Sequence, residues 1–384
     1  MWSRWTVSAT ALGLVALAAS AGVSQHHGHA VGGHESEVPV AEGAVLRLEH
    51  DRGARELRLL VGPVDLPATG GADHGMRVVP VQLVELPITG WLTGFSVHLI
   101  DASGEPLPST LLHHVNVITP DRRELFAGIL QRVAAAGRET APIRLPWPLG
   151  YPVEAGQRVM VAAMLHNPEG PAREGVTLEL RIPYTPARSL LGRLSVQPLY
   201  LDVIPHAGSH SFDLPPGRSE RSWEGRPAVS GRIIGLGGHL HDYAVELRLE
   251  DVTAGRLIWR TTPQLDAAGR VIGMPQDRFV LRRGLPGLPL RSDHVYRLTA
   301  VYDNPTGRTI PAGGMGALGG VIVPNPGTEW PDVDPFAPET RTDIVVTTRT
   351  GLPIVRHPDG RLAGGDPGPP FTAVETHPAS HSHP

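Results

Sequence analysis

Short runs of alternating hydrophobic and polar residues recur along this chain. Residues 176–182 (VTLELRI) and 244–250 (AVELRLE) alternate cleanly, which is typical of strands with one buried face. Residues 76–84 are rich in β-branched side chains, and Pro80 within them predicts a sheet edge or a β-bulge. Only residues 124–135 have a pattern that favours a helix. The chain is therefore expected to consist mainly of strands joined by turns.

Composition supports an all-β fold and narrows the chemistry. The 384 residues include 45 Gly and 39 Pro, too many chain breakers for coiled coils, helical bundles or bundles of membrane helices. A net charge of −4 provides no electrostatic footprint for nucleic acid. The absence of Cys excludes disulfides, thiolate metal sites and a cysteine nucleophile. The 19 His residues are therefore the first place to look for chemistry.

The two ends of the chain differ from its middle. A basic start, an apolar run over 5–18 and Ala19-Ser20-Ala21 predict a signal peptide over 1–21, with an uncleaved anchor as the alternative. The mature protein is then expected to be periplasmic or extracellular, without stable membrane insertion. Residues 22–43 and 351–384 are expected to be disordered, either as solvated linkers or as loose metal binders, because they are rich in His, Gly or Pro.

A weak internal repeat predicts two domains. Residues 90–99 (GWLTGFSVHL) match 231–240 (GRIIGLGGHL) in their Gly and His positions. Later, 165–170 (LHNPEG) match 302–307 (YDNPTG) at nearly the same offset. Chance matching of Gly and Pro is the alternative. The interpretation is two tandem β-sandwiches over 44–190 and 195–350.

An H-x-H pair is the first candidate metal site. His239 and His241 are two positions apart on a predicted strand, so their side chains project to the same face and can reach one ion. Gly237 and Gly238 allow close backbone approach, and Asp242 is a candidate to orient an imidazole. An exposed pair of histidines is the alternative.

Three other positions carry possible donors. His113 and His114 are neighbours, so both reach one ion only at a strand end or a bulge. His166 follows an apolar run, where a structural role is the alternative. Met315 lies in a glycine-rich loop, and its thioether is a soft donor that suits Cu(I), although it could simply be buried.

The remaining internal histidines are weaker candidates. His98 occupies the repeat position of His239, but residue 100 is Ile, so an exposed strand histidine is expected. His206 and His210 could form an extra site, and a solvated loop between the domains is favoured for them.

The order His-His, single His, His-x-His and Met in a glycine-rich loop resembles the copper type II, ascorbate-dependent monooxygenase family. That family includes the peptidylglycine-hydroxylating and dopamine-hydroxylating enzymes. The resemblance covers most of residues 75–325 and implies two tandem antiparallel jelly-roll domains, in agreement with the repeat. It also implies two copper ions per chain and a reductant, ascorbate or another one-electron donor.

The resemblance assigns a role to each donor. His113, His114 and His166 are expected to bind a first copper, which stores and passes an electron. His239, His241 and Met315 are expected to bind a second copper, where O₂ and substrate react. The implied reaction converts a C–H bond, O₂, two electrons and two protons into an alcohol and water. Because only neutral imidazoles bind metal, acid should release it.

Departures from the family bear on the substrate. Peptide-amidating members carry Arg where this chain has Gly237, and Asn and Tyr where it has Ala317 and Gly319. A glycyl-peptide substrate is therefore not expected, and the family's disulfides are absent. The pocket near Met315 is expected to be lined by small residues that admit a bulky or apolar molecule, unless it is not a substrate pocket.

Three functions remain open. The first is an exported copper monooxygenase acting on a small molecule. The second is a non-catalytic copper-binding or copper-handling protein on the same scaffold, and the third is a metal-free interaction module. A serine hydrolase is disfavoured because the sequence has no G-x-S-x-G motif.

Overall fold

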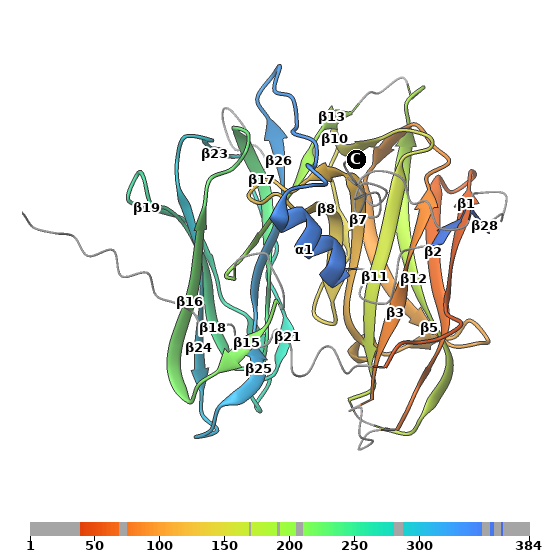
Figure 1. Ribbon diagram of the computed structural model, residues 1–384, viewed down its shortest axis with the longest axis horizontal. Helices are drawn as coiled ribbons and strands as arrows, with labels where there is room; N and C mark the ends of the chain where they lie inside the picture. Colours follow the sequence, from red (N-terminus) through yellow and green to blue (C-terminus); the bar gives the residue numbers. More distant parts are fainter. Residues whose placement is uncertain are drawn as a thin grey trace, which may run out of the picture. The chain divides into compact units, whose positions relative to one another are not determined.

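The structure is a computed structural model that describes residues 39–68, 75–168, 170–189, 193–204, 210–279, 287–347, 354–356 and 362–363. The predicted signal peptide, residues 22–38 of the predicted linker and His206 lie outside this part. The described chain is nearly all β, as the alternating pattern predicted (Figure 1). None of its helices is long and apolar enough to cross a membrane.

The first sandwich unit consists of two sheets. The nine-stranded sheet contains β1 (Val45–Asp51), β2 (Glu56–Leu66), β4 (Gly90–Leu92), β5 (Gly94–Ile100), β6 (Pro106–Leu107), β9 (Ile143–Arg144), β10 (Leu149–Val153), β12 (Arg173–Pro186) and β13 (Leu194–Ser195). The six-stranded sheet contains β3 (Met76–Glu85), β7 (Leu112–Arg123), β8 (Leu130–Gly137), β11 (Arg158–His166), β27 (Ile354–Arg356) and β28 (Leu362–Ala363). A 3₁₀ turn, η2 (Ser109–Leu111), precedes β7.

The second sandwich unit is built in the same way. A five-stranded sheet contains β14 (Gln197–Asp202), β17 (Gly231–Leu240), β22 (Asp277–Arg278), β23 (Leu288–Leu290) and β26 (Gly316–Pro324). A four-stranded sheet contains β16 (Gly217–Gly225), β18 (Ala244–Asp251), β19 (Arg256–Thr261) and β24 (Tyr296–Asn304). Two small ribbons are β15 (Phe212–Leu214) with β25 (Ile310–Gly314), and β20 (Gln264–Leu265) with β21 (Val271–Gly273).

Each unit has its own hydrophobic core between its two sheets. The first core includes Leu57 and Leu178 from one sheet and Val115 and Leu165 from the other. The second core includes Leu201 and Leu236, which face Leu247 and Leu298 in the same manner. The alternation in the sequence produces these cores, because residues two apart on a strand share a face.

The two units share an order of strand pairing. β3-β11-β7-β8 in the first unit corresponds to β16-β24-β18-β19 in the second. Asn167 and Asn304 follow the same pattern, since each side-chain amide donates to the carbonyl four residues later, at 2.9 and 2.8 Å. Each also donates to a carbonyl from an earlier segment, Pro67 or Leu214. The repeated Asn-Pro motif therefore closes the same kind of turn twice.

The predicted strands are present, and Pro80 lies at a bulge. Residues 176–182 fall within β12 and 244–250 within β18. In β3, the residues Pro80 and Val81 stand opposite the single residue Ala162 of β11, where the register shifts. The bulge accommodates a residue that cannot donate to the ladder, as the sequence predicted.

The helix predicted over 124–135 is wrong. Residues 130–137 form β8, because pairing with β7 overrides the helical preference of Ala134, Ala135 and Ala136. The helix of the described chain is instead α1 (Pro338–Thr347). Its Pro at the first helical position and Glu339 in the first turn are start signals that the sequence does contain.

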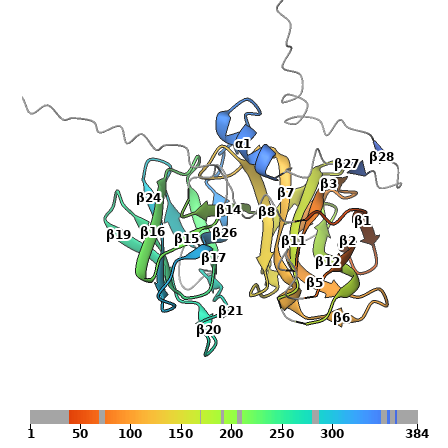
Figure 2. The same cartoon turned by 60° about the horizontal axis from the view of Figure 1, so that its bottom comes forward.

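Segments of each unit pack on the other. Leu125 and Phe126, from the loop before β8, belong to the second core. Burying each such side chain stabilises the fold by roughly 1.5–3 kcal/mol. Conversely α1 lies beside β8 (Figures 1 and 2), and its Ile344 packs with Leu130 in a small cluster on the first unit. Helix α1, from the segment 195–350 that the sequence assigns to the second domain, therefore packs on the first unit.

The predicted C-terminal tail contains two short strands. Strand β27 pairs parallel with β3, and β28 pairs antiparallel with β27. These five residues fall within the segment 351–384 that the sequence predicts to be disordered.

Candidate functional site

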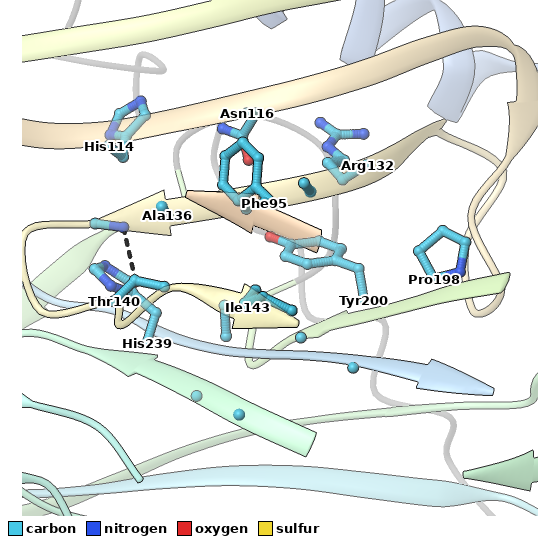
Figure 3. A pocket seen from close by; sticks show the side chains of 18 of the residues that line it. Phe95, His114, Asn116, Arg132, Ala136, Thr140, Ile143, Pro198, Tyr200 and His239 are labelled. Atoms are coloured by element: carbon cyan, nitrogen blue, oxygen red, sulfur yellow. Dashed lines mark hydrogen bonds between the residues drawn. The ribbon is translucent and has the colours of Figure 1, made fainter. Parts of the chain in front are cut away.

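A cavity of about 830 Å³ is lined by residues of both sandwich units. Strands β7 and β8 contribute to one wall, and β14, β17 and β26 to the opposite wall. Of the predicted donors, His113, His114, His239, His241 and Met315 line it. Figure 3 shows His114 and His239 toward one end, and Arg132, Tyr200 and Pro198 toward the other.

His113 and His114 lie at a β-bulge at the start of β7. His114 pairs with Met164 and Leu112 with Leu165, so His113 is an extra residue without an opposite partner in β11. A bulge is the circumstance in which neighbouring strand residues can turn to one side. Accordingly, the Nδ1 atoms of the two rings are 2.9 Å apart.

His166 joins this pair from the neighbouring strand. It is the last residue of β11, and its ring centroid is 6.3 Å from that of His113. The adjacent His113 and His114 and the distant His166 are thus neighbours at one end of the six-stranded sheet.

His239 and His241 lie at the end of β17, and their ring centroids are 5.4 Å apart. Nδ1 of His239 is 2.6 Å from Oε1 of Glu139, a side chain from the first unit that is only 3% exposed. Asp242, which the sequence favoured for this role, instead pairs with Arg138 at 2.7 Å. Glu139 lies in a turn and has no periodic signal in the sequence, so it was not predicted.

Tyr302 connects the other predicted donors. Its hydroxyl accepts a hydrogen bond from the N–H of His241 and another from the N–H of Met315, both at 3.0 Å. It donates its own proton to the carbonyl of Met315. One buried phenol therefore fixes the backbone at both positions. The sequence placed Tyr302 in the repeated turn motif but did not indicate this role.

The two predicted donor sets meet. The ring centroid of His113 is 6.2 Å from that of His241, so ring contacts run from His166 through His113 to His241 and His239. Within the described residues, no group of three or more His, Cys, Asp or Glu side chains is placed so that it could hold a metal ion. The histidines form a continuous cluster and not two closed three-ligand cages.

Burial sets the protonation of the cluster. Burial, followed by repulsion from His239 and His166, lowers the pKa of His113 to about 4. Burial, with the charges of His239 and His113, holds the pKa of His241 well below its usual value. Burial also lowers the pKa of His239, but Glu139 outweighs this effect, and the net shift is upward. His113 and His241 are therefore neutral imidazoles at neutral pH.

The donor chemistry fits copper. Imidazole suits copper in both oxidation states, and a thioether adds preference for Cu(I). Because Nδ1 of His239 is occupied by Glu139, its Nε2 remains for a metal, a common arrangement for metal-binding histidines.

The wall of β17 and β26 is made of small residues. Gly237, Ala317 and Gly319, which replace the polar residues of the peptide-amidating enzymes, all line the cavity. A Cβ at Gly319 would meet nothing within 4 Å, and one at Gly237 would meet only Gln276, at 3.7 Å. The space beside the histidines is therefore open and largely apolar.

The weaker histidine candidates His98 and His210 lie in different environments. His98 is exposed on β5, as predicted, and its Nε2 is 3.1 Å from Oγ of Ser96. His210 is not the solvated loop residue that the sequence favoured, because it lines the cavity and its Nδ1 is 3.1 Å from the buried Asp202.

No protein-family model and no curated protein matches this chain. Among solved structures it is similar to the major capsid protein P2 of bacteriophage PM2, with 11% sequence identity and a TM-score of 0.34. The similarity covers 70% of this chain and 97% of the capsid protein. It is also similar to PNGF-II, with 10% identity, 70% and 66% covered, and a TM-score of 0.36. At these TM-scores neither likeness bears on the site.

Proposed function

We propose that this protein is an exported copper monooxygenase that hydroxylates a C–H bond of a small apolar molecule, using O₂ and an external one-electron reductant such as ascorbate. One observation carries the proposal: donors from four separate places in the sequence gather beside one large, largely apolar cavity. His113, His114 and His166 would hold one copper, and His239, His241 and Met315 the other.

Bound copper would supply one-electron redox chemistry and activation of O₂. Residues of the chain orient and hold the donors that would bind the copper. Glu139 holds the ring of His239 in one orientation, and Tyr302 fixes the backbone of His241 and Met315. Burial keeps His113 and His241 neutral and therefore able to bind metal.

The cavity accounts for the substrate class. Its walls carry mainly aliphatic and small side chains, which favour an apolar molecule. Gly237, Ala317 and Gly319 offer no charged group for a peptide carboxylate, so a glycyl peptide is not proposed.

Copper content is the first test. The full chain, reconstituted with copper and freed of loose metal, is expected to retain two ions. His239→Ala should lose one of them, whereas the matched variant His98→Ala, at an exposed histidine, should keep both. A chain that retains no copper would instead favour a metal-free interaction module.

Oxygen uptake is the second test. The copper-loaded chain with ascorbate should consume O₂ faster when an apolar or phenethyl substrate is added, and an alcohol should form in equal amount. Tight copper binding without any substrate-dependent uptake would favour the alternative, a copper-binding or copper-handling protein.

A further inference from the structure

The cavity between the sandwich units is long and mainly apolar. Residues 132–137 of β8 line one side of it, and residues 234–239 of β17 line the other. At about 3.3 Å per residue, each stretch extends over roughly 17 Å. Arg132 alone in these stretches carries a fixed charge, and its guanidinium pairs with Asp343 at 2.6 Å. The cavity therefore has the length and the lining for an extended alkyl chain.

Two arginines lie at the exposed edge of this cavity, one from each sandwich unit. Arg144 is the last residue of β9, and Arg278 is the last residue of β22. Both residues line the cavity, and both are exposed. Within the part of the chain that the structure describes, neither guanidinium has a hydrogen bond or an ion pair. Their positive charges are therefore available to a ligand.

The two arginines lie at the same end of the cavity. Arg278 pairs with Gly235 in β17. Ile234, the residue before Gly235, belongs to a small apolar cluster against which Leu145 packs. Since Leu145 directly follows Arg144, both arginines stand beside this cluster. Each sandwich unit thus contributes one guanidinium to one edge of the cavity.

The histidine cluster lies at the other end of β17. Gly235 and His239 are four residues apart on this strand, which corresponds to about 13 Å. Each residue between them lines the cavity. A Cβ at Gly237, halfway along, would meet only Gln276, at 3.7 Å. A molecule whose charged end lies at the arginines would therefore extend its apolar end toward the histidines.

We propose that this cavity binds a long-chain anionic amphiphile. Its carboxylate or phosphate lies between Arg144 and Arg278, whose planar guanidinium groups match the oxygens of either anion. Its alkyl chain runs along β17, where burial of apolar surface stabilises it. Binding itself needs no metal. The inference rests on the proposed function only in naming this amphiphile as the substrate class.

Calorimetric titration of the metal-free full chain tests the charge of the ligand. The probes are dodecanoate, dodecyl phosphate, dodecanol and dodecylammonium, each below the concentration at which it forms micelles. At least one anion should bind about tenfold more tightly than dodecanol, since each exposed ion pair contributes at most about 1 kcal/mol. The tighter anion identifies the head group. Equal affinities for the anions and dodecanol, or tighter binding of dodecylammonium, would overturn the inference.

A pair of double variants tests the two arginines. Arg144→Gln with Arg278→Gln should lower the affinity for the anions to that for dodecanol, and leave the affinity for dodecanol unchanged. Arg47→Gln with Arg218→Gln removes the same charge at exposed residues outside the cavity, one in each unit, and should change neither affinity. Equal losses in the two double variants would assign the preference to net charge and contradict a site at this edge.

The outcomes separate this inference from the proposed function. If none of the four probes binds while the chain retains two coppers, the amphiphile site is wrong and copper binding stands. If the anions bind as expected but the chain retains no copper, the amphiphile site is confirmed and the monooxygenase proposal fails.

Discussion

Oε1 of Glu139 lies 2.6 Å from Nδ1 of His239, across the boundary between the two sandwich units. The pair joins a turn of the first unit to a strand end of the second and fixes which ring nitrogen faces the cluster. A carboxylate in this position is worth about 10–100-fold in metal affinity at well-studied sites.

Glu139→Gln is therefore expected to weaken copper binding by about 10–100-fold, because the amide is a poorer acceptor and does not hold the ring as firmly. Competition with a copper chelator measures the change. Glu105→Gln, at an exposed residue, is the matched control. Equal affinities for the two variants would show that Glu139 does not position His239 for metal.

Tyr302→Phe should destabilise the fold and disturb two donors together. The aromatic ring and its contact with Phe212 at 5.9 Å remain, but the N–H groups of His241 and Met315 lose their acceptor. Each buried polar group left without a hydrogen bond lowers the free energy of unfolding by about 1–3 kcal/mol, and denaturant unfolding measures this decrease. Tyr184→Phe, which loses only a bond to His50, should cost less and leave copper binding intact.

Met315→Leu is expected to weaken Cu(I) at one of the two positions and to affect Cu(II) less, because the change removes a soft thioether donor at nearly constant volume. A colorimetric Cu(I) competition assay resolves the two equivalents. Met160→Leu, buried in the small cluster beneath α1, is the control. Equal weakening of both Cu(I) equivalents would contradict the assignment of Met315 to one ion.

Gly319 and its neighbour Gly320 make a matched pair for testing the cavity. A Cβ at Gly319 meets nothing within 4 Å, whereas a Cβ at Gly320 would lie 2.5 Å from the carbonyl oxygen of Gly235. Gly319→Leu should therefore fold normally, bind copper and lose affinity for apolar probes or substrates. Gly320→Ala should lower the free energy of unfolding. Undiminished uptake of apolar molecules by Gly319→Leu would place the substrate elsewhere.

Glu124 predicts a pH dependence of stability. Burial raises its pKa to about 7, despite hydrogen bonds from the N–H groups of Arg132 and Leu125. Between pH 4.5 and 7 the folded chain holds this proton and the unfolded chain does not, so stability falls as pH rises through that window. The contribution is on the order of 3 kcal/mol.

Unfolding of metal-free protein at a series of pH values isolates this effect. Glu124→Gln cannot ionise, so the difference in unfolding free energy between variant and unaltered chain should change by that amount from pH 5 to pH 8. The histidines contribute equally to both proteins and cancel. A difference that is constant with pH would mean that Glu124 keeps an ordinary pKa in the fold.

Local pattern was sufficient for much of the fold. Alternation over 176–182 and 244–250 predicted strands, and Pro80 predicted a bulge, because one buried face and one missing donor act within a few residues. The same reasoning failed over 124–135, where pairing with β7 made a strand of an alanine-rich segment. The helical preference of these residues stabilises the segment less than the inter-strand hydrogen bonds and side-chain burial that pairing with β7 provides.

The donors themselves, five histidines and one methionine, can be read from the chain, and so can the pairs that are neighbours on one strand. Three relationships depend on how the chain folds: the histidines form a single cluster, Glu139 and not Asp242 orients His239, and Tyr302 joins His241 to Met315. These relationships connect residues far apart in sequence, and they exist because two buried cores fix the sheets against each other. No periodicity along the chain encodes such distances.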